Sequence, residues 1–214
     1  MALLKESGLP VLSEEGRDIP FEERAQWERF WMVDPLDGTK EFIKRNGEFT
    51  VNIALIEGGH STMGVIYVPV KSVLYFGGEG IGSFKQDNVS SNQQVQLSNL
   101  LQAAVKLPLP SNGRPFSVVG SRSHMSPETE EFINELKSEH GEIDIVSMGS
   151  SLKICLVAEG VADVYPRFAP TMEWDTAAGQ AIAIGSGKAV IDHTTNQPMQ
   201  YNKENLLNNW FIVK

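Results

Sequence analysis

The first half of the chain alternates short apolar runs with turn-forming residues, which is the pattern of consecutive β-strands. Two apolar runs, Leu9–Leu12 and Phe30–Val33, each end in acidic residues. The charged stretch Gly16–Arg29 between them predicts a surface loop with a helical turn. Three further runs rich in β-branched and aromatic residues, separated by turns, predict an antiparallel meander reaching about Phe84: Thr50–Ile56, Thr62–Val68 and Val73–Phe76.

The second half alternates strand-like and helix-like segments. Ser126 and Pro127 supply a cap residue and a proline at the first helical position, so a helix is predicted from there to about His140. Two more helices are predicted at Ser150–Glu159 and Asp175–Ile184. Strands are predicted around them, at Ser117–Gly120, Ile143–Ser147, Ala162–Tyr165, Ala189–Ile191 and Phe211–Val213. This alternation indicates an α/β layer beside the first-half sheet.

Composition places the chain among globular proteins. It has 214 residues, of which 41% are hydrophobic and 21% charged. The polar stretch Lys85–Gln96 predicts a boundary between a sheet-forming unit, residues 1–96, and an α/β unit, residues 97–214. The single cysteine, Cys155, excludes an internal disulfide and predicts a reducing, cytoplasmic location. It is interpreted as a buried core thiol.

The charge balance excludes some partners and raises a question. The net charge of −9 argues against a nucleic acid polymer as partner. No run approaches the roughly 18 apolar residues of a membrane span, and no secretory signal is visible. Two glycine-containing segments that look like nucleotide loops have the wrong spacing: Gly78–Gly82 is interpreted as a hairpin turn, and Gly187-Lys188 lacks the leading glycine. An acidic chain must still neutralise any anionic substrate that it binds.

The hexapeptide Asp34–Thr39 (DPLDGT) offers such a means. An apolar strand delivers Asp34 at its carboxyl end, where α/β folds place ligands, and Pro35 forces the chain to turn. The turn can aim Asp34, Asp37 and the Leu36 carbonyl at one point. Two carboxylates and a carbonyl are hard oxygen ligands suited to Mg²⁺. Either aspartate alone would indicate only a capped turn, and the complete pattern favours a metal site.

Two other acidic segments can contribute to that site. Ser13-Glu14-Glu15 follows the first apolar run, so Glu14 can supply a third carboxylate while Glu15 is expected to face solvent. Asp175 stands at the predicted start of a helix, where capping is its ordinary role. The small residues Ala177–Gly179 let another backbone or a ligand approach this helix closely. Trp174 is interpreted as a core anchor.

These segments together resemble one known family. Glu14, Asp34–Thr39 and Trp174–Gly179 (WDTAAG) are similar to the metal motifs of the inositol monophosphatase superfamily, Mg²⁺-dependent and lithium-sensitive phosphatases. The resemblance covers essentially the whole chain. Further runs resemble its CysQ branch, the 3′(2′),5′-bisphosphate nucleotidases: Thr39–Ile43, Asn46–Ile53, Ser121–His124, Gly149–Lys153 and Tyr165–Phe168.

The resemblance implies both a fold and a reaction. The fold is α/β, a layered α/β/α/β/α sandwich that here lacks its N-terminal helix pair. The reaction is hydrolysis of the 3′-phosphate of adenosine 3′,5′-bisphosphate to AMP and phosphate in sulfur metabolism. The sulfated analogue, adenosine 3′-phosphate 5′-phosphosulfate, is a second candidate substrate. Two or three Mg²⁺ ions are the implied cofactors.

The same resemblance assigns site residues by position. The implied metal ligands are Glu14, Asp34, the Leu36 carbonyl, Asp37 and Asp175. Thr39 is implied to orient the attacking water, with Glu14 and Asp37 on the same side. The implied substrate contacts are Gly38, Thr39, Ser121, His124, Ser150, Lys153, Arg167 and Asp175. Lys153 and Arg167 are expected to hold the second phosphate of a bisphosphate.

One departure keeps other functions open. Family members begin with two helices, absent here, that carry an aspartate bonded to the threonine matching Thr39; Met1–Leu4 is interpreted as the tail of the second helix. We therefore expect uncovered apolar sheet surface. The alternatives are an inositol or sugar monophosphate phosphatase, or a truncated protein that binds nucleotide or metal without catalysis. The expected partner is a small bisphosphate nucleotide. Association with the inner face of the cell membrane, and a monomeric or homodimeric state, stay open.

Overall fold

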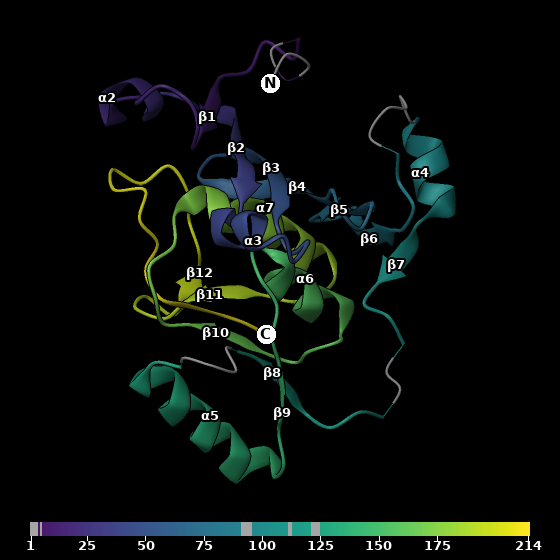
Figure 1. Cartoon of the computed structure of the whole chain (residues 1–214). Helices are drawn as coiled ribbons and strands as arrows, with labels where there is room; N and C mark the ends of the chain where they lie inside the picture. Colours follow the sequence, from purple (N-terminus) through teal and green to yellow (C-terminus); the bar gives the residue numbers. More distant parts are fainter. Residues whose placement is uncertain (1–3, 5, 91–95, 111–112, 121–124) are drawn as a thin grey trace.

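A seven-stranded sheet forms one side of the molecule (Figure 1). The computed structural model describes residue 4 and residues 6–90, 96–110, 113–120 and 125–214. β1 pairs in parallel with β2, and each later strand pairs antiparallel with the one before it. The strands follow chain order: β1 (Val11–Ser13), β2 (Arg29–Asp37), β3 (Thr50–Glu57), β4 (His60–Val68), β5 (Val73–Gly78), β6 (Gly82–Gln86) and β7 (Val105–Leu107). The predicted meander is therefore confirmed.

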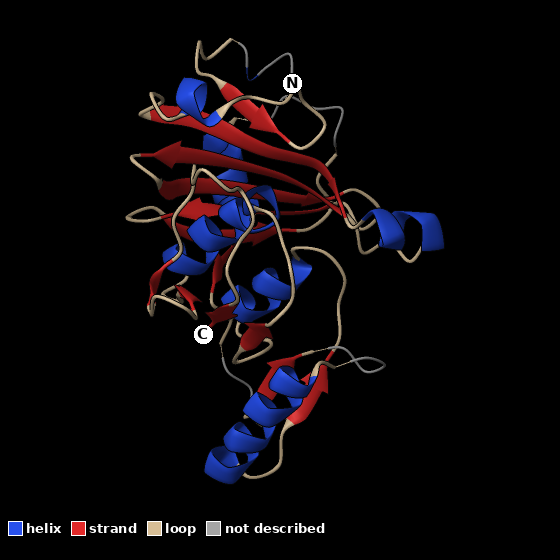
Figure 2. Ribbon diagram, turned by 90° about the vertical axis from the view of Figure 1, so that its left-hand side faces the viewer, coloured by secondary structure: helices blue, strands red, loops and turns tan. Residues whose placement is uncertain are grey.

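Helix α7 (Glu173–Gly185) lies across one face of this sheet, against β2 to β6 (Figure 2). Alternate residues of each strand point towards it, and Ala54, Ile66 and Val68 are fully buried on that face. The small residues predicted to permit close approach do so, because Gly64 of β4 lies directly against the backbone of Ala178. The sheet thus fixes the position of α7 through backbone contact rather than through long side chains.

A second set of layers follows beyond α7. Helix α6 (Leu152–Glu159) packs beside α7, and both lie between the large sheet and a four-stranded sheet. That sheet has the order β10 (Tyr165–Arg167), β13 (Phe211–Val213), β11 (Val190–Asp192) and β12 (Gln197–Pro198). A parallel pair, β8 (Ser117–Val119) and β9 (Asp144–Val146), lies with α5 (Pro127–His140) at the far end. The mixed α/β layering is the one predicted.

Three short helices complete the described elements: α2 (Phe21–Arg24), α3 (Thr39–Lys44) and α4 (Leu97–Ala103). The Ser126 hydroxyl accepts a hydrogen bond from the Thr129 N–H, as expected of the α5 cap, and Gly160 ends α6 in a left-handed conformation. Cys155 is buried in the core, as predicted. None of the described helices combines the length and apolar character needed to cross a bilayer.

The structure corrects three predicted boundaries. β2 does not end at Asp34 but continues to Asp37, because an irregular register between these two residues accommodates Pro35 within the strand. The strand predicted at Ala162–Tyr165 lies instead at Tyr165–Arg167, where it pairs with β13. α7 begins two residues before Asp175, at Glu173. The boundary proposed at residues 85–96 stays a prediction.

The face of the large sheet away from α7 carries apolar side chains near solvent. Met63 is 38% exposed, and Trp31, Val65 and Tyr67 are half-buried there. The Trp31 indole N–H donates to the Ser7 hydroxyl, so the segment before β1 covers part of this face.

Candidate active site

The parallel pairing of β1 with β2 brings two acidic residues together at one edge of the sheet. Ser13 is aligned with Val33, and the Glu14 N–H donates to the Val33 carbonyl at 3.2 Å. Glu14 follows β1 directly and Asp34 is the next residue of β2 after Val33, so the two carboxylates lie close to each other. The sequence could not show this, because nothing in it fixes the register of β1.

Asp34 is the most deeply buried member of the site. Its side chain is fully buried, and one carboxylate oxygen, Oδ1, accepts the Leu36 N–H at 2.9 Å. The other oxygen, Oδ2, is buried with no hydrogen-bond partner in the described part of the chain. A buried carboxylate oxygen without a donor is costly, and a cation at that position would remove the cost.

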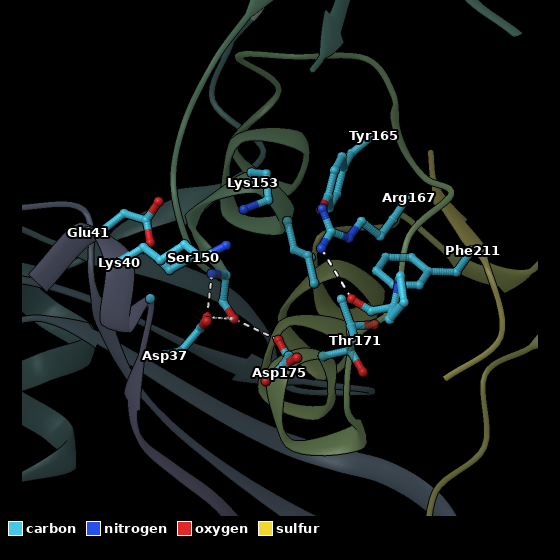
Figure 3. A pocket seen from close by; sticks show the side chains of 15 residues that line it. Asp37, Lys40, Glu41, Ser150, Lys153, Tyr165, Arg167, Thr171, Asp175 and Phe211 are labelled. Carbon is cyan, nitrogen blue, oxygen red and sulfur yellow. Dashed lines mark hydrogen bonds between the residues drawn. The ribbon is translucent and has the colours of Figure 1, made fainter. Parts of the chain in front are cut away.

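Asp37 and Asp175 complete a cluster with Asp34. Each of the three offers a carboxylate oxygen, and these atoms lie within 4.8 Å of one another. Asp175 is the third residue of α7, and its carboxylate accepts the Met172 N–H at 2.8 Å. It therefore caps the helix from inside its first turn, while still facing Asp37 (Figure 3).

Several donors fix the orientation of Asp37. Its Oδ2 accepts the Ser151 N–H at 2.6 Å, the Thr50 hydroxyl at 3.3 Å and the Asn52 amide at 3.3 Å. Because these bonds converge on one carboxylate oxygen, Oδ1 is left for a cation. Sequence reasoning did not assign this role to Ser151, Thr50 or Asn52.

The electrostatics of the cluster indicate a cation site. Burial, together with the nearby Asp37 and Glu14 carboxylates, raises the pKa of Asp34 to about 9 despite the lowering effect of the Leu36 N–H. Burial, with the Asp37 and Glu14 carboxylates, likewise raises the pKa of Asp175 to about 7 despite the lowering effects of the Met172 N–H and of Arg167. Crowded carboxylates of this kind hold protons when no metal compensates their charge. The donor set, all oxygen, suits a hard divalent ion.

A pH-dependent stabilisation by Mg²⁺ follows. Without metal, the folded chain keeps protons on Asp34 and Asp175 that the unfolded chain releases above the ordinary pKa of 3.8. Stability of the metal-free protein should therefore fall as the pH rises from about 4 through about 7 and 9. Mg²⁺ replaces those protons, so the rise in Tm that it causes should grow between about pH 5 and pH 9. Thermal melts in Mg²⁺ and in EDTA measure it.

The variant Asp34→Asn serves as the comparison for that experiment, because it removes the most strongly shifted carboxyl. Its Tm in EDTA should vary less with pH than that of the wild type. A Mg²⁺-induced shift of equal size at both ends of the pH range would contradict the assignment of this cluster as a cation site.

A cleft of about 480 Å³ opens above the aspartates. Figure 3 shows Asp37 and Asp175 facing each other on one side, with Lys153, Tyr165 and Arg167 gathered opposite them. Burial lowers the pKa of Lys153, and Arg167 lowers it further against the raising effect of Asp37. The Lys153 ammonium lies 5.9 Å from the centre of the Tyr165 ring.

Arg167 is directed into the same cleft. Its Nη2 donates to the Pro170 carbonyl at 3.2 Å, and its Nε is buried with no hydrogen-bond partner in the described ranges. Two cationic side chains therefore face an acidic cluster across one cavity. The arrangement fits an anion with two negative groups, one bound through a metal ion at the aspartates and the other bound by the cationic side chains.

A second cavity of about 450 Å³ adjoins the first and shares Glu41, Lys153, Tyr165 and Arg167 with it. Its remaining lining is mixed, with the apolar side chains of Met125, Met148 and Phe168 beside polar and charged ones such as Lys44 and Glu48. The predicted contacts Ser121 and His124 lie outside the described residues. The chain enters and leaves that segment at Gly120 and Met125, which both line this cavity.

Comparison with known proteins decides the family. The profile described as the inositol monophosphatase family matches residues 5–210. This chain belongs to the inositol monophosphatase family. Enzymes of the family are metal-dependent, and the acidic cluster of this member has the composition of a metal site.

Individual members of the family are similar to this chain over most of its length. The 3′(2′),5′-bisphosphate nucleotidase CysQ of Salmonella typhimurium is 48% identical over 206 residues, which cover 96% of this chain and 75% of that protein. The CysQ of Haemophilus influenzae is 35% identical and is covered over 71% of its length. The crystal structure of CysQ from Bacteroides thetaiotaomicron matches with a TM-score of 0.94 and 55% identity, covering 100% of this chain and 79% of that one. Inositol monophosphatase II of Staphylococcus aureus, 24% identical with a TM-score of 0.69 and coverage of 99% and 71%, shows the shared fold alone.

Within this family member, the structure brings together most of the predicted site residues. Glu14, Asp34, Asp37 and Asp175 converge, and Gly38, Ser150, Lys153 and Arg167 line or adjoin the cleft. Gly38 has φ +92°, and a Cβ there would lie 3.2 Å from the Cβ of Ser150, so glycine is required at this approach. Thr39 is the exposed first residue of α3, beside the cleft. The participation of Thr39 and of the Leu36 carbonyl stays a prediction.

Proposed function

We propose that this chain is a Mg²⁺-dependent phosphatase that removes the 3′-phosphate of adenosine 3′,5′-bisphosphate, giving AMP and phosphate. The observation that carries the proposal is the pairing of the aspartate cluster with Lys153 and Arg167 across one cleft. A simple phosphate monoester needs only the acidic side. A substrate with two phosphates uses both sides, and the adjoining cavity, which includes the apolar side chains of Met148 and Phe168, offers space for a base.

The metal would be held by residues that the fold already brings together. We assign Glu14, Asp34, Asp37, Asp175 and the Leu36 carbonyl as its ligands, all of them oxygen donors. The buried, unpartnered Oδ2 of Asp34 supports this assignment. Two or three Mg²⁺ ions fit the number of carboxylates. When bound, they would neutralise the phosphoryl oxygens and lower the pKa of a bound water.

The chain's own residues account for binding and orientation. Lys153 and Arg167 would hold the phosphate that is not cleaved, Arg167 through the planar guanidinium suited to two-point contact. Thr39 would orient the attacking water through its hydroxyl, next to Glu14 and Asp37. Gly38 and Ser150 would let the phosphate approach the backbone closely. The partly apolar second cavity would exclude water from the nucleoside.

A substrate panel tests the proposal. Purified protein is given adenosine 3′,5′-bisphosphate, its 5′-phosphosulfate analogue, inositol 1-phosphate and fructose 1,6-bisphosphate, each with Mg²⁺, and phosphate release is measured. We expect the two nucleotides to be the best substrates. Faster hydrolysis of inositol or fructose phosphates would favour a sugar phosphatase. Stabilisation by Mg²⁺ and AMP without turnover on any substrate would favour a non-catalytic binding protein.

Removal of the cationic pair should discriminate between substrates. Lys153→Ala and Arg167→Ala should each raise the KM for adenosine 3′,5′-bisphosphate by about tenfold or more, since a charge-assisted contact contributes roughly 1.5–3 kcal/mol. The loss on a simple monophosphate should be smaller. Lys137→Ala, which removes an exposed cation of α5, is the control. Equal losses on both kinds of substrate would count against the assignment of a second phosphate site.

A further inference from the structure

Three buried serines tie α7 to the elements around it. The Ser61 hydroxyl donates to the Ala177 carbonyl at 2.7 Å, and the Ser83 hydroxyl donates to the Ile182 carbonyl at 2.6 Å. The Ser151 hydroxyl lies 2.6 Å from the carbonyl of Asp175. The three contacts are alike in length and in burial. They differ in what else the hydroxyl touches.

Ser151 alone among these serines also contacts the acidic cluster. Its hydroxyl lies 2.5 Å from Asp37 Oδ2, and its N–H donates to the same oxygen at 2.6 Å. Within the described ranges it is the one side chain with hydrogen bonds both to Asp37 and to the backbone of Asp175. The dashed lines in Figure 3 mark these bonds between the two aspartates.

The bonding capacity of the hydroxyl makes this position specific. A serine hydroxyl has one proton to donate and can accept from other donors. The Asn52 amide donates to Ser151 Oγ at 2.9 Å, which fixes the oxygen from the side of β3. The single proton is then directed to Asp37 or to the Asp175 carbonyl. In both arrangements the hydroxyl stays between them, held by Asn52 and by the start of α6.

The need for such a tie follows from charge. Asp37 lies at the end of β2 and Asp175 in the first turn of α7, yet their carboxylate oxygens come within 4.8 Å of each other. Two ionised carboxylates at this distance repel each other. Their separation therefore depends on how firmly the two elements are joined at this end, and a divalent ion is sensitive to that spacing.

We infer that Ser151 is a positioning residue that sets the spacing between Asp37 and Asp175 and thereby the affinity of the site for a divalent cation. This inference rests on the metal site of the proposed function. Removing the hydroxyl should weaken cation binding by about tenfold, as is usual when a partner of a ligating carboxylate is lost. Binding of the nucleotide at saturating metal should change little, so the effect falls on metal affinity rather than on KM.

Direct binding of Mn²⁺, followed by the electron paramagnetic resonance signal of the free ion, provides the test. The variants are Ser151→Ala and, as a matched control, Ser61→Ala, which loses an equally buried hydroxyl bond to α7 without touching a carboxylate. We expect the Kd for Mn²⁺ to rise about tenfold in Ser151→Ala and to stay within about twofold in Ser61→Ala. Equal Kd values in the two variants would overturn the inference.

A second pair of variants guards against a general packing defect. Ser151→Thr and Ser151→Val have nearly the same shape and differ in the hydroxyl. Ser151→Thr should bind Mn²⁺ more tightly than Ser151→Val, and equal binding would overturn the role of the hydroxyl even if Ser151→Ala fails to fold. Absence of Mn²⁺ binding in the wild type would refute the proposed metal site itself. Wild-type binding together with normal Ser151→Ala binding would refute this inference alone.

Discussion

Asp37→Asn should lower phosphatase activity by roughly 10²–10³-fold while leaving the fold intact. The substitution removes one negative charge from the aspartate cluster but keeps an oxygen that can accept the Ser151 N–H, now 2.6 Å from Oδ2. Loss of about 3–4 kcal/mol of charge stabilisation at the reacting phosphate corresponds to a fall in kcat of roughly 10²–10³-fold. Initial rates of phosphate release at saturating Mg²⁺ measure the effect.

Stability should move in the opposite direction to activity. Asp37 raises the pKa of Asp34 and Asp175 through repulsion, so its neutral replacement should preserve or increase the Tm in EDTA. Asp144→Asn, which makes the same chemical change on the exposed part of β9, should leave both activity and Tm unaltered. Wild-type turnover in Asp37→Asn would refute the assignment of Asp37 as a metal ligand.

Gly64→Ala should cause a large loss of stability. A Cβ at this position would lie 2.2 Å from the carbonyl oxygen of Ala178, and neither backbone can yield without separating β4 from α7. Overpacking of this kind costs about 3 kcal/mol or more. For a chain of this size that corresponds to a decrease in Tm of roughly 6–12 °C. Thermal unfolding followed by circular dichroism is the measurement.

Gly64→Ala should also weaken metal binding at the active site. Asp175 lies one turn before Ala178 on α7, so displacing the helix moves a carboxylate of the cluster, and Mn²⁺ binding should weaken together with stability. The comparison is Gly120→Ala, where the nearest atom to a new Cβ is 3.5 Å away and the expected change is below about 1 kcal/mol. Equal Tm values for the two variants would show that α7 does not pack as closely on the sheet as described.

The sequence predicts those helices and strands in which buried and exposed side chains follow each other with a regular period. The meander from β3 to β6 and the helices α5 and α7 follow from such patterns, and the structure confirms them. Helix α4 is not among the predicted elements: Leu97, Leu100 and Leu101 have helical spacing, but the helix is a short one of seven residues and none of them is buried. β2 was predicted too short because Pro35 usually ends a strand, whereas here an irregular register keeps it within one.

The residues of the site also fall into those that the sequence predicts and those that it does not. The acidic residues were predictable, because Asp34 and Asp37 are close in sequence and belong to a distinctive motif. The groups that orient them were not, since Ser151 is 114 residues from Asp37 and 99 residues from Asn52. Such contacts depend on how α6 packs against the sheet. The proximity of Glu14 to Asp34 likewise depends on the register of a three-residue strand.

Identification of the product formed from adenosine 3′,5′-bisphosphate tests the central claim most directly. The protein is incubated with this nucleotide and Mg²⁺, and the products are separated by chromatography against authentic 5′-AMP and 3′-AMP. The site described above predicts 5′-AMP with one equivalent of phosphate, and no reaction in EDTA. Formation of 3′-AMP, release of phosphate without metal, or recovery of unchanged nucleotide would contradict it.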